Sequence, residues 1–167
     1  MRVYIPATVT MLRTLADDGE IAAVNNTAFA LTPGLREYYQ SGSAEELEYA
    51  AMLDAARASL RLIAAELDAD PKAMPRRAVI SADVDGVTLR PDLDFSVVRL
   101  DSAVPLKVVA AVHLDSADAE DAVRAAAAVI DAADLGDPDA EFTLGDAEDY
   151  ELSWYATQEL PFLLELL

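Results

Sequence analysis

One long amphipathic helix sets the first limit on what this chain can fold into. Apolar residues recur at steps of three and four and build one face, namely Leu47, Ala50, Leu53, Ala56, Leu60, Ile63 and Leu67. Ser43 and Glu46 precede this face at the spacing of a capping box, so we expect a helix over residues 44–67. Such a helix needs an apolar surface to pack against, and the rest of the chain must supply it.

Segments rich in β-branched residues predict that this surface is a β-sheet. Four segments have the composition of strands, namely residues 2–7, 27–33, 95–100 and 107–114. The last of them is a nearly continuous apolar run, which is typical of an interior strand. Residues 77–84 and 87–90 flank Asp85-Gly86, a two-residue turn signal, so we expect these two segments to form a hairpin.

The remaining pattern predicts further helices and a fold class. Helices are expected from Thr8 or Thr10 to about Asp18, over residues 119–134, and over residues 146–160, with a short strand at 141–144. This order indicates a single α+β domain over residues 1–167, a mainly antiparallel sheet with helices packed on one face. A ferredoxin-like arrangement is compatible with this order, and the alternation before residue 70 also allows parallel neighbours.

The net charge of −19 is concentrated in the last third of the chain. Residues 1–113 contain 16 acidic and 11 basic residues, whereas residues 114–167 contain 15 acidic residues and one basic residue, Arg124. An anionic field of this size disfavours direct binding to nucleic acid or to an anionic membrane. The same composition serves solubility and arises from GC-rich coding, which is the reading that the charge alone favours, and the functional alternative is attraction to a basic protein partner.

Several kinds of chemistry are absent from the sequence. The chain has no Cys and no run apolar enough for a membrane span or signal peptide, so we expect a cytoplasmic protein. No phosphate-binding glycine motif or nucleophile elbow occurs. His113 is the single His, and its neighbours Asp115 and Ser116 do not converge with it on a strand. We therefore expect His113 to be a hydrogen-bonded structural residue.

Residues 137–148 come nearest to a metal-binding motif. The ligand positions of a calcium loop would be occupied by Asp137, Asp139, Glu141, Thr143 and Glu148. The position that requires Gly for the sharp turn is occupied by Phe142, which resists that backbone conformation. The sequence therefore predicts no calcium binding here, and more generally no metal site and no cofactor.

The segment 146–160 contains the single Trp of the chain. On a helix, Tyr150 and Trp154 lie four residues apart on one face, and the acidic residues Glu148 and Glu151 lie elsewhere. This pattern favours aromatic residues packed in the core and solvated acids. The alternative is an aromatic hot spot with an acidic rim, which makes Tyr150, Trp154, Glu148 and Glu151 a candidate interaction surface.

Four stretches of the chain resemble an uncharacterised protein family of high-GC actinobacteria. They are MRVYIPAT, AFALTPGLREYY, ELEYAAMLDAARASLRLIA and AADLGDPDAEF followed by AEDYELSWYATQEL. Together they reach across nearly the whole chain. The resemblance implies an actinobacterial cytoplasmic protein and assigns no activity, ligand or site to any residue.

Two classes of function remain. The first is a non-enzymatic interaction or regulatory module that presents the acidic surface of residues 114–167 to a protein partner. The second is a small enzyme or ligand-binding domain that uses carboxylate, Tyr and Arg side chains. The absence of a catalytic motif favours the first, and a buried cleft that gathers Arg, Tyr and Asp from separate segments would favour the second.

Overall fold

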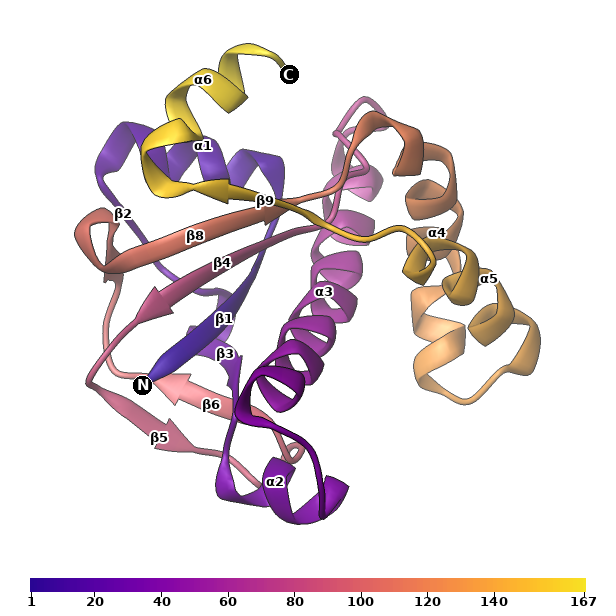
Figure 1. Cartoon of the computed structure of the whole chain (residues 1–167). Helices are drawn as coiled ribbons and strands as arrows, with labels where there is room; N and C mark the ends of the chain where they lie inside the picture. Colours follow the sequence, from indigo (N-terminus) through magenta and orange to yellow (C-terminus); the bar gives the residue numbers. More distant parts are fainter.

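Seven strands form one antiparallel sheet in the order β5-β6-β3-β1-β4-β8-β9, in a computed structural model that describes residues 1–167 (Figure 1). The strands are β1 (Arg2–Ala7), β3 (Thr27–Ala30), β4 (Ala78–Asp83), β5 (Val87–Leu89), β6 (Val97–Leu100), β8 (Val109–Leu114) and β9 (Ser153–Ala156). A separate two-stranded sheet pairs β2 (Glu20–Ile21) with β7 (Val104–Pro105). All neighbours are antiparallel, so none of the pairings is the parallel one that the sequence left open.

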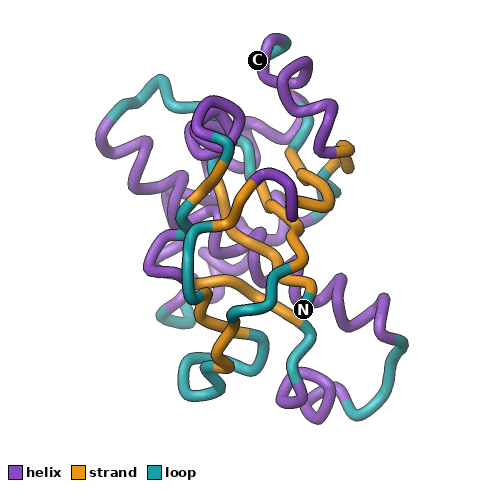
Figure 2. The backbone as a smooth tube through the Cα atoms, turned by 90° about the vertical axis from the view of Figure 1, so that its left-hand side faces the viewer, coloured by secondary structure: helices purple, strands orange, loops and turns teal.

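Six α-helices surround the sheet, and Figure 2 shows the strands running through the middle of the molecule. They are α1 (Val9–Asp18), α2 (Pro33–Tyr39), α3 (Ala44–Ala69), α4 (Glu120–Asp134), α5 (Pro138–Glu148) and α6 (Leu160–Glu165). Helix α1 begins with Thr8, whose side chain accepts a hydrogen bond from the Met11 amide, and ends at Gly19 with a φ of 75°. Both ends are those that the sequence predicts.

Helices cover both faces of the sheet, whereas the sequence led us to expect them on one face. Val3 and Ile5 of β1 pack in a cluster that includes residues of α1 and α6. Tyr4, which lies between them, packs on the opposite face in a cluster with residues of α3. Because alternate residues of a strand point to opposite faces, one apolar strand serves both clusters. The α+β class and the antiparallel sheet are confirmed.

Helix α3 is the predicted long helix, and its capping residue is confirmed. The Glu46 amide donates to Ser43 Oγ (3.2 Å). Leu60 and Ile63 are buried as expected, but Leu53 is 45% exposed, so its assignment to the core is wrong. Small residues such as Ala51 and Ala55 face the sheet instead, because they allow a close approach. The sequence pattern gave more weight to the larger Leu.

Two local predictions of strand structure are wrong. Asp85-Gly86 does not close a hairpin, because β4 pairs with β1 and β8 while β5 pairs with β6. Residues 141–144 are not a strand but part of α5, which Asp137 caps through the amides of Asp139 and Ala140. Pro138 in the first turn further favours this early helix start.

Helices α4 and α5 form an antiparallel pair that packs on the second half of α3. The predicted inward residues of α4 are all buried, namely Val123, Ala126, Ala127 and Ile130. They pack in one cluster with Leu60 and Ile63 of α3 and Leu144 of α5. This cluster fixes α5, and therefore the chain segment that leads from α5 into β9.

Candidate functional site

The segment 146–160 is not the helix that the sequence predicts. Helix α5 ends at Glu148, a short connection follows, and residues 153–156 form β9, which pairs with β8. Trp154 is 62% exposed and Tyr150 is 40% exposed, so the prediction that both pack in the core is wrong. In the extended chain Leu152 packs against the α3 cluster and Tyr155 against the opposite cluster, which leaves Trp154 at the surface.

The connection from α5 to β9 forms one wall of a groove of about 660 Å³, and α3 forms the other. We call this groove the acidic groove. Its charged and large side chains are Tyr39, Tyr49, Leu53, Asp54, Arg57, Arg77, Glu148, Asp149 and Glu151. Two predicted surface residues, Glu148 and Glu151, therefore line it, and Tyr150 lies between them in the sequence. The α2 and α3 residues of the groove were missed by the sequence analysis.

Both guanidinium groups of the acidic groove are already neutralised within the protein. Arg77 pairs with Asp115 in a buried ion pair (2.8 Å), and Arg57 pairs with Asp134 and Glu141. None of the ion pairs of the structure includes Glu148, Asp149 or Glu151. The carboxylates along the connection are therefore uncompensated, and the groove is anionic.

The buried Arg77–Asp115 pair also holds the connection in place. Arg77 donates through Nε and Nη2 to the two carboxylate oxygens of Asp115, and Nη2 donates in addition to the Tyr150 carbonyl oxygen (2.8 Å). The Arg77 backbone amide donates to Asp115 as well. One ion pair therefore joins the start of β4, the end of β8 and the middle of the connection.

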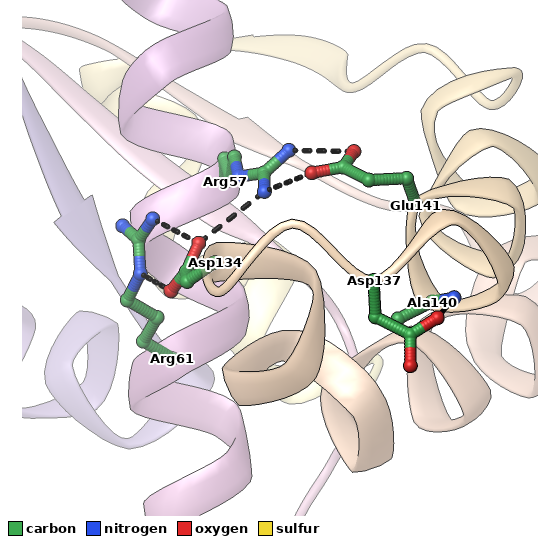
Figure 3. Close-up of polar contacts among 6 residues, drawn as sticks. All are labelled: Arg57, Arg61, Asp134, Asp137, Ala140 and Glu141. Atoms are coloured by element: carbon green, nitrogen blue, oxygen red, sulfur yellow. Dashed lines mark hydrogen bonds and ion pairs between the residues drawn. The ribbon is translucent and has the colours of Figure 1, made fainter.

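A second charge network fixes α5 on α3 (Figure 3). Arg57 of α3 binds Glu141 of α5 (2.8 Å), and Arg57 and Arg61 both bind Asp134 at the end of α4 (3.2 and 2.7 Å). The hydrogen bond from Arg61 lowers the pKa of Asp134, so this carboxylate stays charged. Nearby, burial raises the pKa of Asp54, whose carboxylate accepts a hydrogen bond from Ser96.

The chain's single imidazole and single indole are neighbours on the sheet. His113 of β8 lies opposite Trp154 of β9, and its Nε2 is 2.7 Å from Ser81 Oγ. Burial, and to a smaller extent Arg2, lowers the pKa of His113, so the ring is neutral at pH 7. The Asp115 carboxylate is bound to Arg77 and not to His113, so His113, Asp115 and Ser116 do not form the catalytic trio considered from the sequence. This geometry agrees with a hydrogen-bonded structural His.

The acidic groove does gather Arg, Tyr and Asp from separate segments, which is the feature expected of an enzyme. However, Tyr39 and Tyr49 are about half exposed, so the groove is an open surface and not a buried cleft. Its two Arg side chains are committed to ion pairs, and no nucleophile lies beside a general base within it. The acidic groove is therefore an open anionic surface with exposed Tyr side chains at its margin.

Comparison with known proteins gives a family but no activity. No helix of the structure combines the length and apolar character needed to cross a membrane. No curated protein and no solved structure matches the chain. The model of a family of unknown function (DUF6912) matches residues 1–164, which is nearly the whole chain, and the chain therefore belongs to this family.

Proposed function

We propose that this protein is a non-enzymatic, cytoplasmic interaction or regulatory module that binds a basic segment of a partner protein. The docking surface consists of the acidic groove together with Tyr150 and Trp154. One observation carries the proposal: three carboxylates without an ion-pair partner, Glu148, Asp149 and Glu151, line the groove at the segment that leads into β9 and its exposed Trp154.

The chemistry of the docking surface suits a cationic ligand. Lys and Arg side chains are attracted to the faces of Trp and Tyr rings, and Trp154, Tyr49 and Tyr39 are exposed. Unpaired carboxylates beside these rings supply charge complementarity, which mainly increases association rate and specificity. Trp and Tyr are also the residues that most often carry binding energy at protein interfaces.

The rigidity of the surface supports the proposal further. The connection is fixed by the hydrogen bond from Arg77 to the Tyr150 carbonyl, and α5 is fixed by Arg57. A partner would therefore lose little binding energy to ordering the docking surface. The concentration of acidic residues after residue 113 adds a longer-range attraction for basic chains.

The test uses a fluorescein-labelled synthetic peptide of alternating Lys and Val, with a Glu and Val peptide as charge control. Fluorescence anisotropy should show saturable binding of the basic peptide alone, and added salt should weaken it. The triple variant Glu148→Gln, Asp149→Asn, Glu151→Gln should bind at least about tenfold more weakly, a loss of roughly 1.4 kcal/mol.

A matched control separates a local site from the general negative field. The triple variant Asp17→Asn, Asp18→Asn, Glu20→Gln removes the same charge from exposed positions at the end of α1 and the start of β2. It should bind the basic peptide as the unmodified protein does. Equal losses in the two triple variants, or no saturable binding at all, would contradict the proposed function.

A further inference from the structure

We infer that the partner segment binds as an additional β-strand along the free edge of β9, with its basic side chains over the carboxylates that precede this strand. The inference rests on the proposed function and adds the conformation and register of the partner. Such strand addition takes its affinity from main-chain hydrogen bonds and its specificity from side chains.

Strand β9 is a short edge strand without the charged or proline residues that protect many edges. It is the last strand of the sheet and pairs with β8 alone, as Figure 1 shows. Proteins normally protect such edges with Lys, Pro, a bulge or a covering element. The four residues of β9, Ser-Trp-Tyr-Ala, contain no charge and no Pro, and their register with β8 is regular. This edge, which includes the exposed Trp154, therefore carries no charged or proline residue that would oppose pairing.

The hydrogen-bond phase of the sheet shows which groups face this edge. The Asp115 amide donates to the Arg77 carbonyl (3.0 Å), so these two residues are a hydrogen-bonded pair at the end of the β4–β8 ladder. Since the phase alternates along an antiparallel strand, His113 also bonds toward β4. Leu114 lies between His113 and Asp115, and Val112 precedes His113. The backbone N–H and C=O groups of these two residues therefore bond toward β9.

The same alternation continues into β9. Tyr155 lies opposite Val112, and Ser153 lies opposite Leu114. The backbone N–H and C=O groups of Tyr155 and Ser153 are therefore bonded to β8. Trp154 and Ala156 consequently present their N–H and C=O groups to the open edge. The exposed indole thus belongs to a residue whose backbone is also free to bind.

The position of the acidic residues selects the occupant of the edge. A strand paired with β9 that extends beyond Ser153 runs toward the connection, which contains Asp149 and Glu151, and toward the end of α5 at Glu148. Lys or Arg on the added strand would meet these carboxylates, and an apolar or cationic side chain would cover Trp154. A second copy of the chain is disfavoured, because each copy carries a net charge of −19.

The variant Ala156→Pro tests strand addition without removing any acidic residue. Ala156 has a φ of −65°, which the proline ring adopts without strain, and its N–H makes no bond to β8 by the phase derived above. Proline removes this edge donor, so the Lys and Val peptide should bind at least about tenfold more weakly. The control Ala156→Ser keeps the N–H and should bind normally, and both variants should keep the melting temperature of the unmodified protein.

Amide hydrogen exchange gives an independent measurement on the unmodified protein. On addition of the Lys and Val peptide, the amides of Trp154 and Ala156 should become protected. Those of Ser153 and Tyr155 should be slow already in the free protein, because they bond to β8. A peptide with every backbone amide N-methylated keeps its charge but has no N–H donor on either edge, and it should bind at least about tenfold more weakly.

The outcomes separate this inference from the proposed function. If the acidic triple variant loses binding while Ala156→Pro and the N-methylated peptide bind normally, the acidic groove is the site and strand addition is wrong. If the Lys and Val peptide does not bind at all, both proposals fail. If sedimentation shows a dimer that Ala156→Pro dissociates, β9 pairs with a second copy and the inferred partner is wrong.

Discussion

His113 and Trp154 lie directly opposite each other on strands β8 and β9, on the face of the sheet that includes Val79 of the α3 cluster. The imidazole is partly buried and bound to Ser81, whereas the indole is exposed. The titratable imidazole therefore lies beside the single Trp of the chain, whose fluorescence can be measured. Two measurements follow from this arrangement.

The first concerns the exposure of Trp154. Its native emission should be red-shifted and readily quenched by acrylamide, because the side chain is 62% exposed. Trp154→Ala should change the free energy of unfolding by no more than about 1 kcal/mol, the range of an exposed cross-strand pair. A loss of about 3–5 kcal/mol would instead indicate a buried Trp and contradict the structure.

The second concerns pH. Because burial lowers the pKa of His113 in the folded state, the unfolded chain takes up the proton first as the pH falls through about 6.5. The folded state should lose stability from about pH 6.5 downward until its own lower pKa is passed, and this contribution should be constant above pH 7. Urea unfolding at pH 7.5 and 5.5 measures the difference.

The comparison variant is His113→Gln, which has no titratable ring. Its loss of stability between these two pH values should be smaller than that of the unmodified protein, since the imidazole no longer contributes to the proton uptake. An identical pH dependence in both proteins would show that His113 is not held neutral by its surroundings.

Sequence patterns located the elements that local spacing determines. Helix periodicity depends on residues three or four positions apart, so it can be recognised in the sequence. It correctly predicted the capping residue Ser43, the buried Leu60 and Ile63, and the α4 face with Val123 and Ile130. Strand pairing is not local in this way. The turn signal at Asp85-Gly86 predicted a hairpin. The partners of β4 are instead β1 and β8, which are distant from it in the sequence.

The candidate site was found only in part for the same reason. Tyr150 and Trp154 fit a helix by their spacing of four, but pairing with β8 draws Trp154 into a strand and to the surface. Tyr39 and Tyr49 come from α2 and α3, and no pattern in the sequence connects them with Glu148. Leu53, which also lines the groove, was assigned to the core because it fits the helical periodicity.

Helix α3 offers a matched pair of substitutions. Leu60→Ala should cost about 2–5 kcal/mol, because Leu60 is 1% exposed and packs against α4 and α5. Leu53→Ala removes the same atoms from a residue that is 45% exposed, and it should cost far less, within about 1 kcal/mol. Equal losses in the two variants on chemical denaturation would contradict the orientation of α3.

Residues 137–148 should not bind calcium. They form α5 and its cap, in which the Asp137 side chain already accepts from the amides of Asp139 and Ala140. Calorimetry with calcium chloride should show no saturable heat. Micromolar binding that Glu148→Gln removes would contradict this prediction, because it would require the helix to open into a loop.

The buried pair of Arg77 and Asp115 should be the most sensitive polar contact of the fold. Asp115→Asn leaves a guanidinium group without its counter-ion at a side-chain exposure of 3%, and it should cost about 3–5 kcal/mol. Asp121→Asn breaks the exposed pair with Arg124 and should leave the melting temperature unchanged. Urea unfolding of the two variants measures the contrast.

A double substitution separates the loss of the ion pair from the cost of an unpaired buried charge. Arg77→Met with Asp115→Leu removes both charges and should be more stable than Asp115→Asn, since apolar side chains can replace a buried pair. It should nevertheless bind the Lys and Val peptide more weakly, because the Tyr150 carbonyl loses the donor that fixes the connection. Unchanged binding in this variant would show that the connection is held by other contacts, such as those of Leu152 with the α3 cluster.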